Sequence, residues 1–196
     1  MKKILISLIV LFISFGNKIA ADTTNSIKQI NEGKEDAKIT IITYESLTCG
    51  HCADFHKDVY PQLKKEFIDT GIVKIVFRHF PLDMAALNAS KIAQCNNDGK
   101  STLLHFLFLN QEKWVAGKTV NDVNENLKKL LKDENINIDF EKCTNDKNIE
   151  DYVLNDRIEG VKKFKVNATP TIIINNKKFE KSLNYKNLKK SIEKLI

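Results

Sequence analysis

Residues 42–61, ITYESLTCGHCADFHKDVYP, decide how this chain is interpreted. Cys49 and Cys52 stand two residues apart, after an apolar, β-branched segment and before residues that recur at helical spacing. A thiol at a helix N-terminus is stabilised as thiolate by unpaired backbone N–H groups and by the helix dipole. In such motifs the cysteine pKa falls from about 8.5 to roughly 3.5–7. The placement therefore favours a redox-active pair in which Cys49 is the more acidic thiol.

Two other roles for the pair stay open at this point. A structural zinc site needs four ligands, usually a second cysteine pair or suitably spaced histidines. The other two cysteines, Cys95 and Cys143, stand singly and far apart, so no metal site is expected. A permanent structural disulfide between Cys49 and Cys52 is the second alternative, and it would resist mild reduction.

The N-terminus predicts export. Residues 1–21 combine Lys2 and Lys3, an apolar run over residues 4–15 and a small-residue end at Ala20 and Ala21, which is the pattern of a secretory signal peptide cleaved after Ala21. The apolar run is shorter than the roughly 20 residues that a membrane span needs. In an oxidising compartment, an even number of cysteines favours disulfide chemistry.

The charge balance gives no argument for nucleic-acid binding. Residues 1–21 carry three lysines and no acidic residue, so cleavage would lower the formal net charge from +6 to +3. A surplus this small, spread along the chain, indicates a solvated surface rather than a basic patch.

The order of the expected elements predicts an α/β fold. Residues 38–46 and 72–77 are expected as strands that flank a helix, which makes a βαβ unit with parallel pairing. Four helical stretches follow at residues 84–95, 101–114, 120–134 and 137–164. A hairpin with a turn at Asn175 and Asn176 and a final helix over residues 184–196 complete the chain as ββα. We expect one sheet built from residues 22–82 and 160–196, with residues 83–159 inserted as a helical domain.

Together these features resemble the DsbA-like group of thioredoxin-fold thiol:disulfide oxidoreductases, which are exported bacterial proteins. The resemblance is carried by Cys49-Gly50-His51-Cys52 with Phe55 after it, by VFRHFPLDMAALNAS at residues 76–90, and by TPTI at residues 169–172. It covers nearly all of the chain after residue 21. It implies a thioredoxin-like fold with an inserted helical domain and protein-disulfide oxidoreductase activity without a cofactor.

The resemblance also implies roles for single residues. Cys49 would form the mixed disulfide with substrate, and Cys52 would resolve it. Gly50 and His51 would modulate the pair, although the best-known DsbA-type oxidants carry proline where this chain has Gly50, which leaves its potential open. The Thr169–Pro170 bond would be cis and would present a backbone edge to a substrate strand.

The implied function is the introduction of disulfides into reduced secreted proteins in the periplasm. The implied reoxidant is a quinone-linked membrane protein of DsbB type. A monomer is expected, because residues 22–37 leave no room for the dimerisation domain that periplasmic isomerases carry. The alternatives are a disulfide isomerase or reductase, and a binding or chaperone module with permanent disulfides.

The remaining cysteines predict a second, non-catalytic disulfide. Cys95 and Cys143 each follow an apolar residue by three positions, so each is expected to face inward from its helix. Two separate buried thiols are the alternative, because free cysteine packs well as a small hydrophobic residue.

Four polar residues near these motifs are expected to be structural. Glu45, the acid nearest to the pair in the strand, is expected to be exposed at the strand end. His56 and His79 are interpreted as structural or surface residues, and the segment around His105 is interpreted as a buried helix face.

Overall fold

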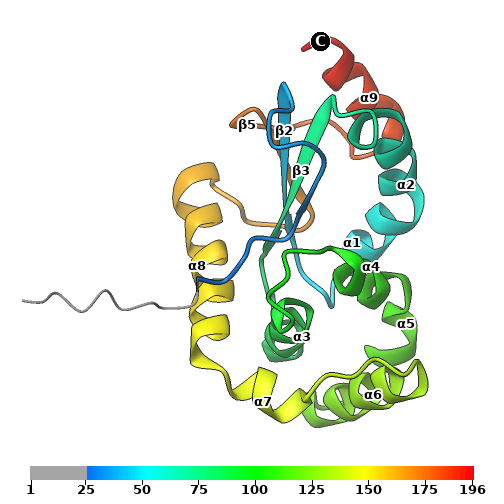
Figure 1. Cartoon of the computed structure of the whole chain (residues 1–196), viewed down its shortest axis with the longest axis vertical. Coiled ribbons are helices and arrows are strands. Elements are labelled where there is room, and N and C mark those ends of the chain that lie inside the picture. The colour runs from blue at the N-terminus through cyan, green and yellow to red at the C-terminus, as the bar shows by residue number, and fades with distance from the viewer. Residues whose placement is uncertain (1–25) are drawn as a thin grey trace, which may run out of the picture.

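The computed structural model describes residues 26–196 (Figure 1). The predicted signal peptide lies outside these residues. Within them, no helix is long and apolar enough to cross a membrane.

A five-stranded mixed sheet forms the centre of the fold, in the order β1-β3-β2-β4-β5. The strands are β1 (Asn31–Glu32), β2 (Ile39–Glu45), β3 (Val73–His79), β4 (Thr171–Ile174) and β5 (Lys177–Lys178). β2 pairs in parallel with β3 and antiparallel with β4, while β1 pairs antiparallel with β3. This arrangement confirms the expected βαβ and ββα units in one thioredoxin-like sheet. The turn at Asn175 and Asn176, both with positive φ, connects β4 to β5 as predicted.

One continuous helical segment follows β2 and carries the cysteine pair. It comprises α1 (Gly50–Asp54), the wider π-helical turns Phe55–Val59 and Lys64–Ile68, and α2 (Tyr60–Leu63) between them. Pro61 lies inside this segment without ending it, directly after the π-helical turn Phe55–Val59.

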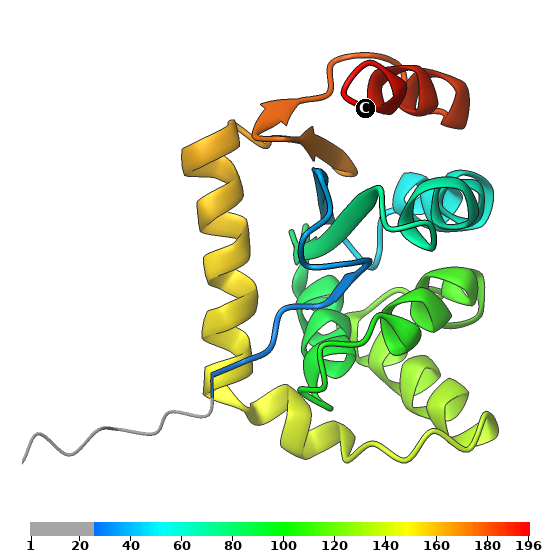
Figure 2. The same cartoon turned by 45° about the horizontal axis from the view of Figure 1, so that its top comes forward.

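Helices cover both faces of the sheet and one of its ends (Figures 1 and 2). α8 (Lys147–Phe164) lies on one face, and α1, α2 and α9 (Tyr185–Glu193) lie on the other. The inserted helices gather beyond one end of the sheet: α3 (Met84–Gln94), α4 (Thr102–Leu109), α5 (Gln111–Trp114), α6 (Val120–Asp133) and α7 (Phe140–Asn145). The expected boundary between residues 159 and 160 falls inside α8, and the division into two domains stays a prediction.

The two faces of β2 enter different parts of the core. Ile39 and Ile41 pack in the main cluster with Cys52 and Phe55 of the helical segment that follows β2. On the other face, Tyr44 packs with the end of α8 in a smaller cluster. The side chain of Glu45, in step with Ile39 and Ile41, therefore lies on the face that α1 covers.

Candidate active site

Cys49 occupies the N-cap position of α1, and Cys52 lies one turn inside that helix. The Cys49 carbonyl accepts the backbone N–H groups of Cys52 (3.1 Å) and Ala53 (3.2 Å). Cys49 is half-buried, whereas Cys52 is fully buried, and both are free thiols. An incoming sulfur atom can therefore reach Cys49 more readily than Cys52.

The loop before β4 lies against this pair. The Thr169–Pro170 bond is cis, and the Sγ atom of Cys49 lies 3.4 Å from the Thr169 carbonyl oxygen. The resemblance to DsbA-like proteins implied both the isomer and the placement of this loop.

The two thiols have opposite acid–base properties. The pKa of Cys49 is lowered to about 5, chiefly by hydrogen bonding from the Cys52 thiol, with help from Thr169 and from backbone N–H groups and against the effect of burial. The pKa of Cys52 is raised, chiefly by burial and then by its hydrogen bond to Cys49 and the charge of Glu45. At neutral pH the pair is therefore a thiolate at Cys49 beside a neutral thiol at Cys52.

This difference predicts a distinctive pH profile of alkylation. The rate at which iodoacetamide modifies Cys49 in the reduced protein is expected to be half-maximal near pH 5, because only the thiolate reacts. The folded-state pKa is below that of an unfolded cysteine. The reduced protein should thus gain stability from this thiolate at high pH and lose that gain as the pH falls through about 5. Mass spectrometry of the modified peptide checks the assignment, and a midpoint near that of free cysteine would contradict it.

The two central residues of the motif, Gly50 and His51, make few contacts with the rest of the protein. The His51 side chain is exposed, with its Nδ1 atom 3.4 Å from a carboxylate oxygen of Asp54. A Cβ atom built on Gly50 would meet no atom within 4 Å. Gly50 and His51 therefore do not block access to Cys49.

The helical insertion holds the motif through three hydrogen bonds that the sequence did not predict. Gln111 Nε2 donates to the carbonyl oxygens of Leu47 (2.8 Å) and Cys49 (3.0 Å), and Thr48 Oγ1 donates to Asp83 Oδ2 (2.7 Å). The partners are 35 to 64 residues apart, so no local pattern could have indicated them.

The expectation that Glu45 is exposed is wrong. Glu45 is 4 % exposed, and its Oε2 atom lies 2.9 Å from Nε2 of His56, which is itself buried. The alternation along β2 turns this carboxyl group beneath the active-site helix, where a histidine one turn after Cys52 meets it. The second carboxyl oxygen, Oε1, is buried without a hydrogen-bond partner.

The positions of His79 and His105 agree with the expectations of a structural residue and of a buried helix face. His79 is buried, with its Nε2 atom 3.3 Å from Gln94 Oε1. His105 lies on the mostly buried helix α4, but its ring reaches both His56 and Glu32.

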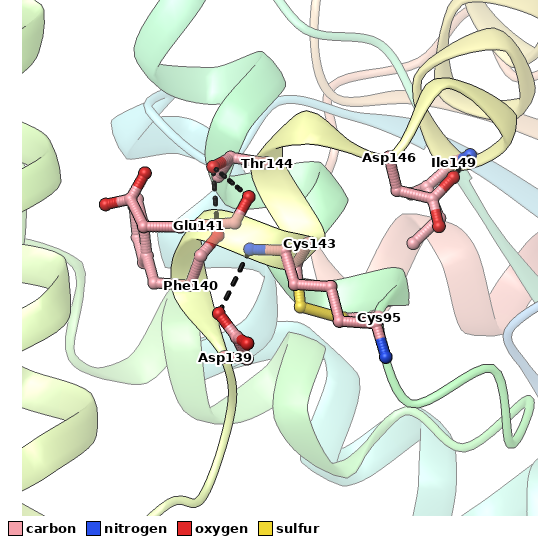
Figure 3. Close-up of a disulfide and its surroundings, with 9 residues drawn as sticks. Cys95, Asp139, Phe140, Glu141, Cys143, Thr144, Asp146 and Ile149 are labelled. Carbon is pink, nitrogen blue, oxygen red and sulfur yellow. Dashed lines mark hydrogen bonds between the residues drawn. A yellow bond between two sulfur atoms is a disulfide. The ribbon is translucent and has the colours of Figure 1, made fainter.

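The Cys95–Cys143 disulfide joins the end of α3 to α7 (Figure 3). Cys95 and Cys143 are bonded with a Cα–Cα distance of 5.6 Å, as predicted. Asp139 begins α7, and its carbonyl accepts the backbone N–H of Cys143 at 3.0 Å. Among residues 26–196, no group of three or more His, Cys, Asp or Glu side chains is arranged to hold a metal ion.

Comparisons with known proteins identify the family. A family model described as thioredoxin matches residues 25–194, and the chain belongs to this family. The crystal structure of alpha-DsbA1 from Wolbachia pipientis matches with a TM-score of 0.76 and 31% identity, over 85% of this chain and 90% of that one. Within the thioredoxin family, the chain is thus a member of the DsbA-like thiol:disulfide oxidoreductases.

Two further relatives are consistent with this membership. The crystal structure of oxidised BdbD from Bacillus subtilis matches with a TM-score of 0.68 and 25% identity, over 85% of this chain and 92% of that one. A Rickettsia bellii protein, named provisionally as a protein-disulfide oxidoreductase, is 31% identical over 147 residues, which are 73% of this chain and 55% of that protein. The chain therefore spans about half the length of this relative.

Proposed function

We propose that this protein is an exported thiol:disulfide oxidoreductase that introduces disulfides into secreted proteins. The observation that carries the proposal is the unequal pair, an accessible Cys49 with its pKa near 5 beside a buried Cys52 with a raised pKa. A stabilised thiolate favours the reduced form of the pair, and this makes the disulfide form an oxidant.

The reaction proceeds by two displacements. A substrate thiolate attacks Cys49 of the Cys49–Cys52 disulfide, forms a mixed disulfide with Cys49 and releases Cys52 as a thiolate that takes up a proton. A second substrate thiolate then attacks the substrate sulfur of the mixed disulfide and releases Cys49 as a stable thiolate. The substrate loses two electrons, and the cysteine pair gains them. The two substrate thiols also lose two protons, of which one is taken up by Cys52 and the other by solvent.

Glu45 is suited to exchange that proton with Cys52. Its carboxyl group is buried on the face of β2 beneath α1, and its charge contributes to the raised pKa of Cys52. Because Oε1 has no hydrogen-bond partner, it is free to donate a proton when Cys52 leaves and to accept one when Cys52 must attack again.

A groove beside the pair supports a polypeptide substrate. A cavity of about 520 Å³ is lined by His51, Phe55, Val59, Pro170 and Leu183, together with Thr169. Its mainly apolar wall suits the side chains of an unfolded segment, and the backbone before Pro170 offers a hydrogen-bonding edge to an extended strand.

The cellular setting belongs to the same proposal. Residues 1–21 would direct the chain to the periplasm and be removed there, and a membrane protein of DsbB type would reoxidise the cysteine pair. The protein would act as a monomer on reduced secreted proteins, with no cofactor and no nucleic-acid partner.

The reduction potential of the Cys49–Cys52 pair tests the proposal. Equilibration with glutathione, read from the fraction of oxidised protein, is expected to give a value much closer to about −120 mV than to about −270 mV. A potential near −270 mV would indicate a reductase. A pair that no glutathione buffer reduces would indicate a binding module with a structural disulfide.

A further inference from the structure

A chain of four polar side chains runs from beneath the cysteine pair to the surface. Glu45 Oε2 lies 2.9 Å from His56 Nε2, His56 Nδ1 lies 2.7 Å from His105 Nδ1, and His105 Nε2 lies 2.9 Å from Glu32 Oε1. Each contact is within hydrogen-bond distance.

Side-chain exposure rises along this chain. It is 3% for Glu45 and 0% for His56, then 15% for His105 and 16% for Glu32. Glu32 also pairs with Lys64, whose side chain is 41% exposed. The inner end is buried, and the outer end is partly exposed.

The outer end opens into a separate groove, away from the substrate groove. Tyr60, Pro61, Phe106 and His105 line this cavity of about 820 Å³, together with Glu32. The charged residues around it are Lys57, Lys64, Lys65, Asp69 and Lys100. Small molecules and water can therefore reach the His105–Glu32 end without passing the cysteine pair.

Packing fixes the two imidazole rings. His56 stacks on Phe108 with ring centroids 4.1 Å apart, and His105 stacks on Tyr60 at the same distance. Tyr60 and Ser101 donate hydrogen bonds to Glu32, which fix its carboxylate. These contacts and the His105 contact hold the pKa of Glu32 low despite its burial, and burial lowers the pKa of His105.

Counting protons shows what such a chain can do. Each of the three contacts needs one proton, and two neutral imidazoles supply only two. A third proton, taken up by one of the four groups, completes the three hydrogen bonds. When each proton moves to the acceptor of its own hydrogen bond, one proton is in effect carried from Glu45 to Glu32 with no change in heavy-atom positions.

We propose that His56, His105 and Glu32 form a proton path that connects Glu45 beneath Cys52 with solvent in the groove of Tyr60 and Phe106. The path supplies a proton when Cys52 leaves as a thiolate and removes one when Cys52 must attack. It rests on the proposed function, because only disulfide exchange requires Cys52 to change its protonation state.

Oxidation of the reduced protein by glutathione disulfide separates the two steps on which the test depends. At a low concentration of glutathione disulfide, the oxidation rate reports the attack of the Cys49 thiolate on glutathione disulfide. At high glutathione disulfide it reaches a plateau set by the attack of Cys52 on the mixed disulfide, and this attack requires loss of the Cys52 proton.

The critical variant is His105→Ala, and Tyr60→Phe is its matched control. The first removes the middle of the path. The second removes one of the hydrogen bonds that fix Glu32, but it keeps the ring that stacks on His105 and the three contacts of the path. For His105→Ala we expect a plateau lowered by roughly 10²-fold, the lower range of positioned proton transfer, with an unchanged rate at low glutathione disulfide. Added imidazole should restore the plateau in His105→Ala and leave Tyr60→Phe and the unmodified protein unaffected.

Each other outcome overturns the path. A His105→Ala plateau equal to that of the unmodified protein would show that Cys52 exchanges its proton elsewhere. If the plateau falls equally in His105→Ala and Tyr60→Phe and imidazole does not restore it, the network only stabilises the helix that carries the cysteine pair. If His105→Ala does not fold, Glu32→Gln keeps the side-chain size and should lower the same plateau, and a normal plateau would again overturn the path. An unmodified protein that fails to react with glutathione disulfide would instead overturn the proposed function and the path with it.

Discussion

Cys49→Ser is expected to reduce disulfide transfer to the uncatalysed rate, whereas Cys52→Ser is expected to accumulate mixed disulfides with substrates. The reason is the geometry of the pair, in which only Cys49 is accessible and acidic. Without Cys52, the enzyme–substrate disulfide at Cys49 loses its internal resolving thiol. Oxidation of a reduced, unfolded substrate protein measures the first effect, and non-reducing electrophoresis with mass spectrometry measures the second.

The control for both variants is the double replacement Cys95→Ala with Cys143→Ala. It removes the other two sulfur atoms and leaves the Cys49–Cys52 pair in place, so it should retain disulfide transfer. Mixed disulfides that accumulate in the Cys49→Ser variant, but not in Cys52→Ser, would reverse the roles of the two thiols.

Reduction of the Cys95–Cys143 disulfide is expected to lower the free energy of unfolding by about 4 kcal/mol. The bond closes a loop with a sequence separation of 48, and the chain-entropy model assigns that value to a loop of this length. Cys143 is also buried in the core cluster, so the bond connects α3 and α7 where both already pack.

The measurement uses a background in which Cys49 and Cys52 are both serine. Reductant then changes only the Cys95–Cys143 bond, and urea unfolding with and without reductant gives the difference directly. A second measurement, with Cys95→Ala and Cys143→Ala added to this serine background, should show no response to reductant. Equal unfolding free energies with and without reductant in the serine background would contradict the expected contribution.

Several features of the fold and site could be predicted from local sequence. Segment 38–46 is apolar and β-branched, the helical spacing begins directly after Cys49, and the Asn175–Asn176 pair indicates a tight turn. The strands and helices lie within a few residues of the expected positions because backbone propensity and hydrophobic period act over short stretches. The thiolate preference of Cys49 was also predicted from local sequence, but its chief cause in the structure is the hydrogen bond from the Cys52 thiol rather than the helix N-terminus.

Other features depended on segments that meet only in the folded chain. Strand β1 is two residues long and lies in a polar segment, so its pairing with β3 left no pattern in the sequence. In the sequence, Glu45 is an acidic residue at the end of a strand, where exposure is expected. It is buried because His56 packs against its carboxyl group in the folded chain.

The sequence by itself determined the reactive chemistry of this protein: a CxxC at a strand–helix junction, a TPTI loop and two further cysteines able to pair. Only the tertiary structure decided the surroundings of Cys52, because Glu32, Glu45, His56 and His105 come from four separate segments, with partners up to 73 residues apart. Thiol reactivity begins with backbone geometry that neighbouring residues set. A buried polar chain exists only where packing excludes water and leaves each group its hydrogen-bond partner, and that condition is met by the whole fold rather than by any one stretch of it.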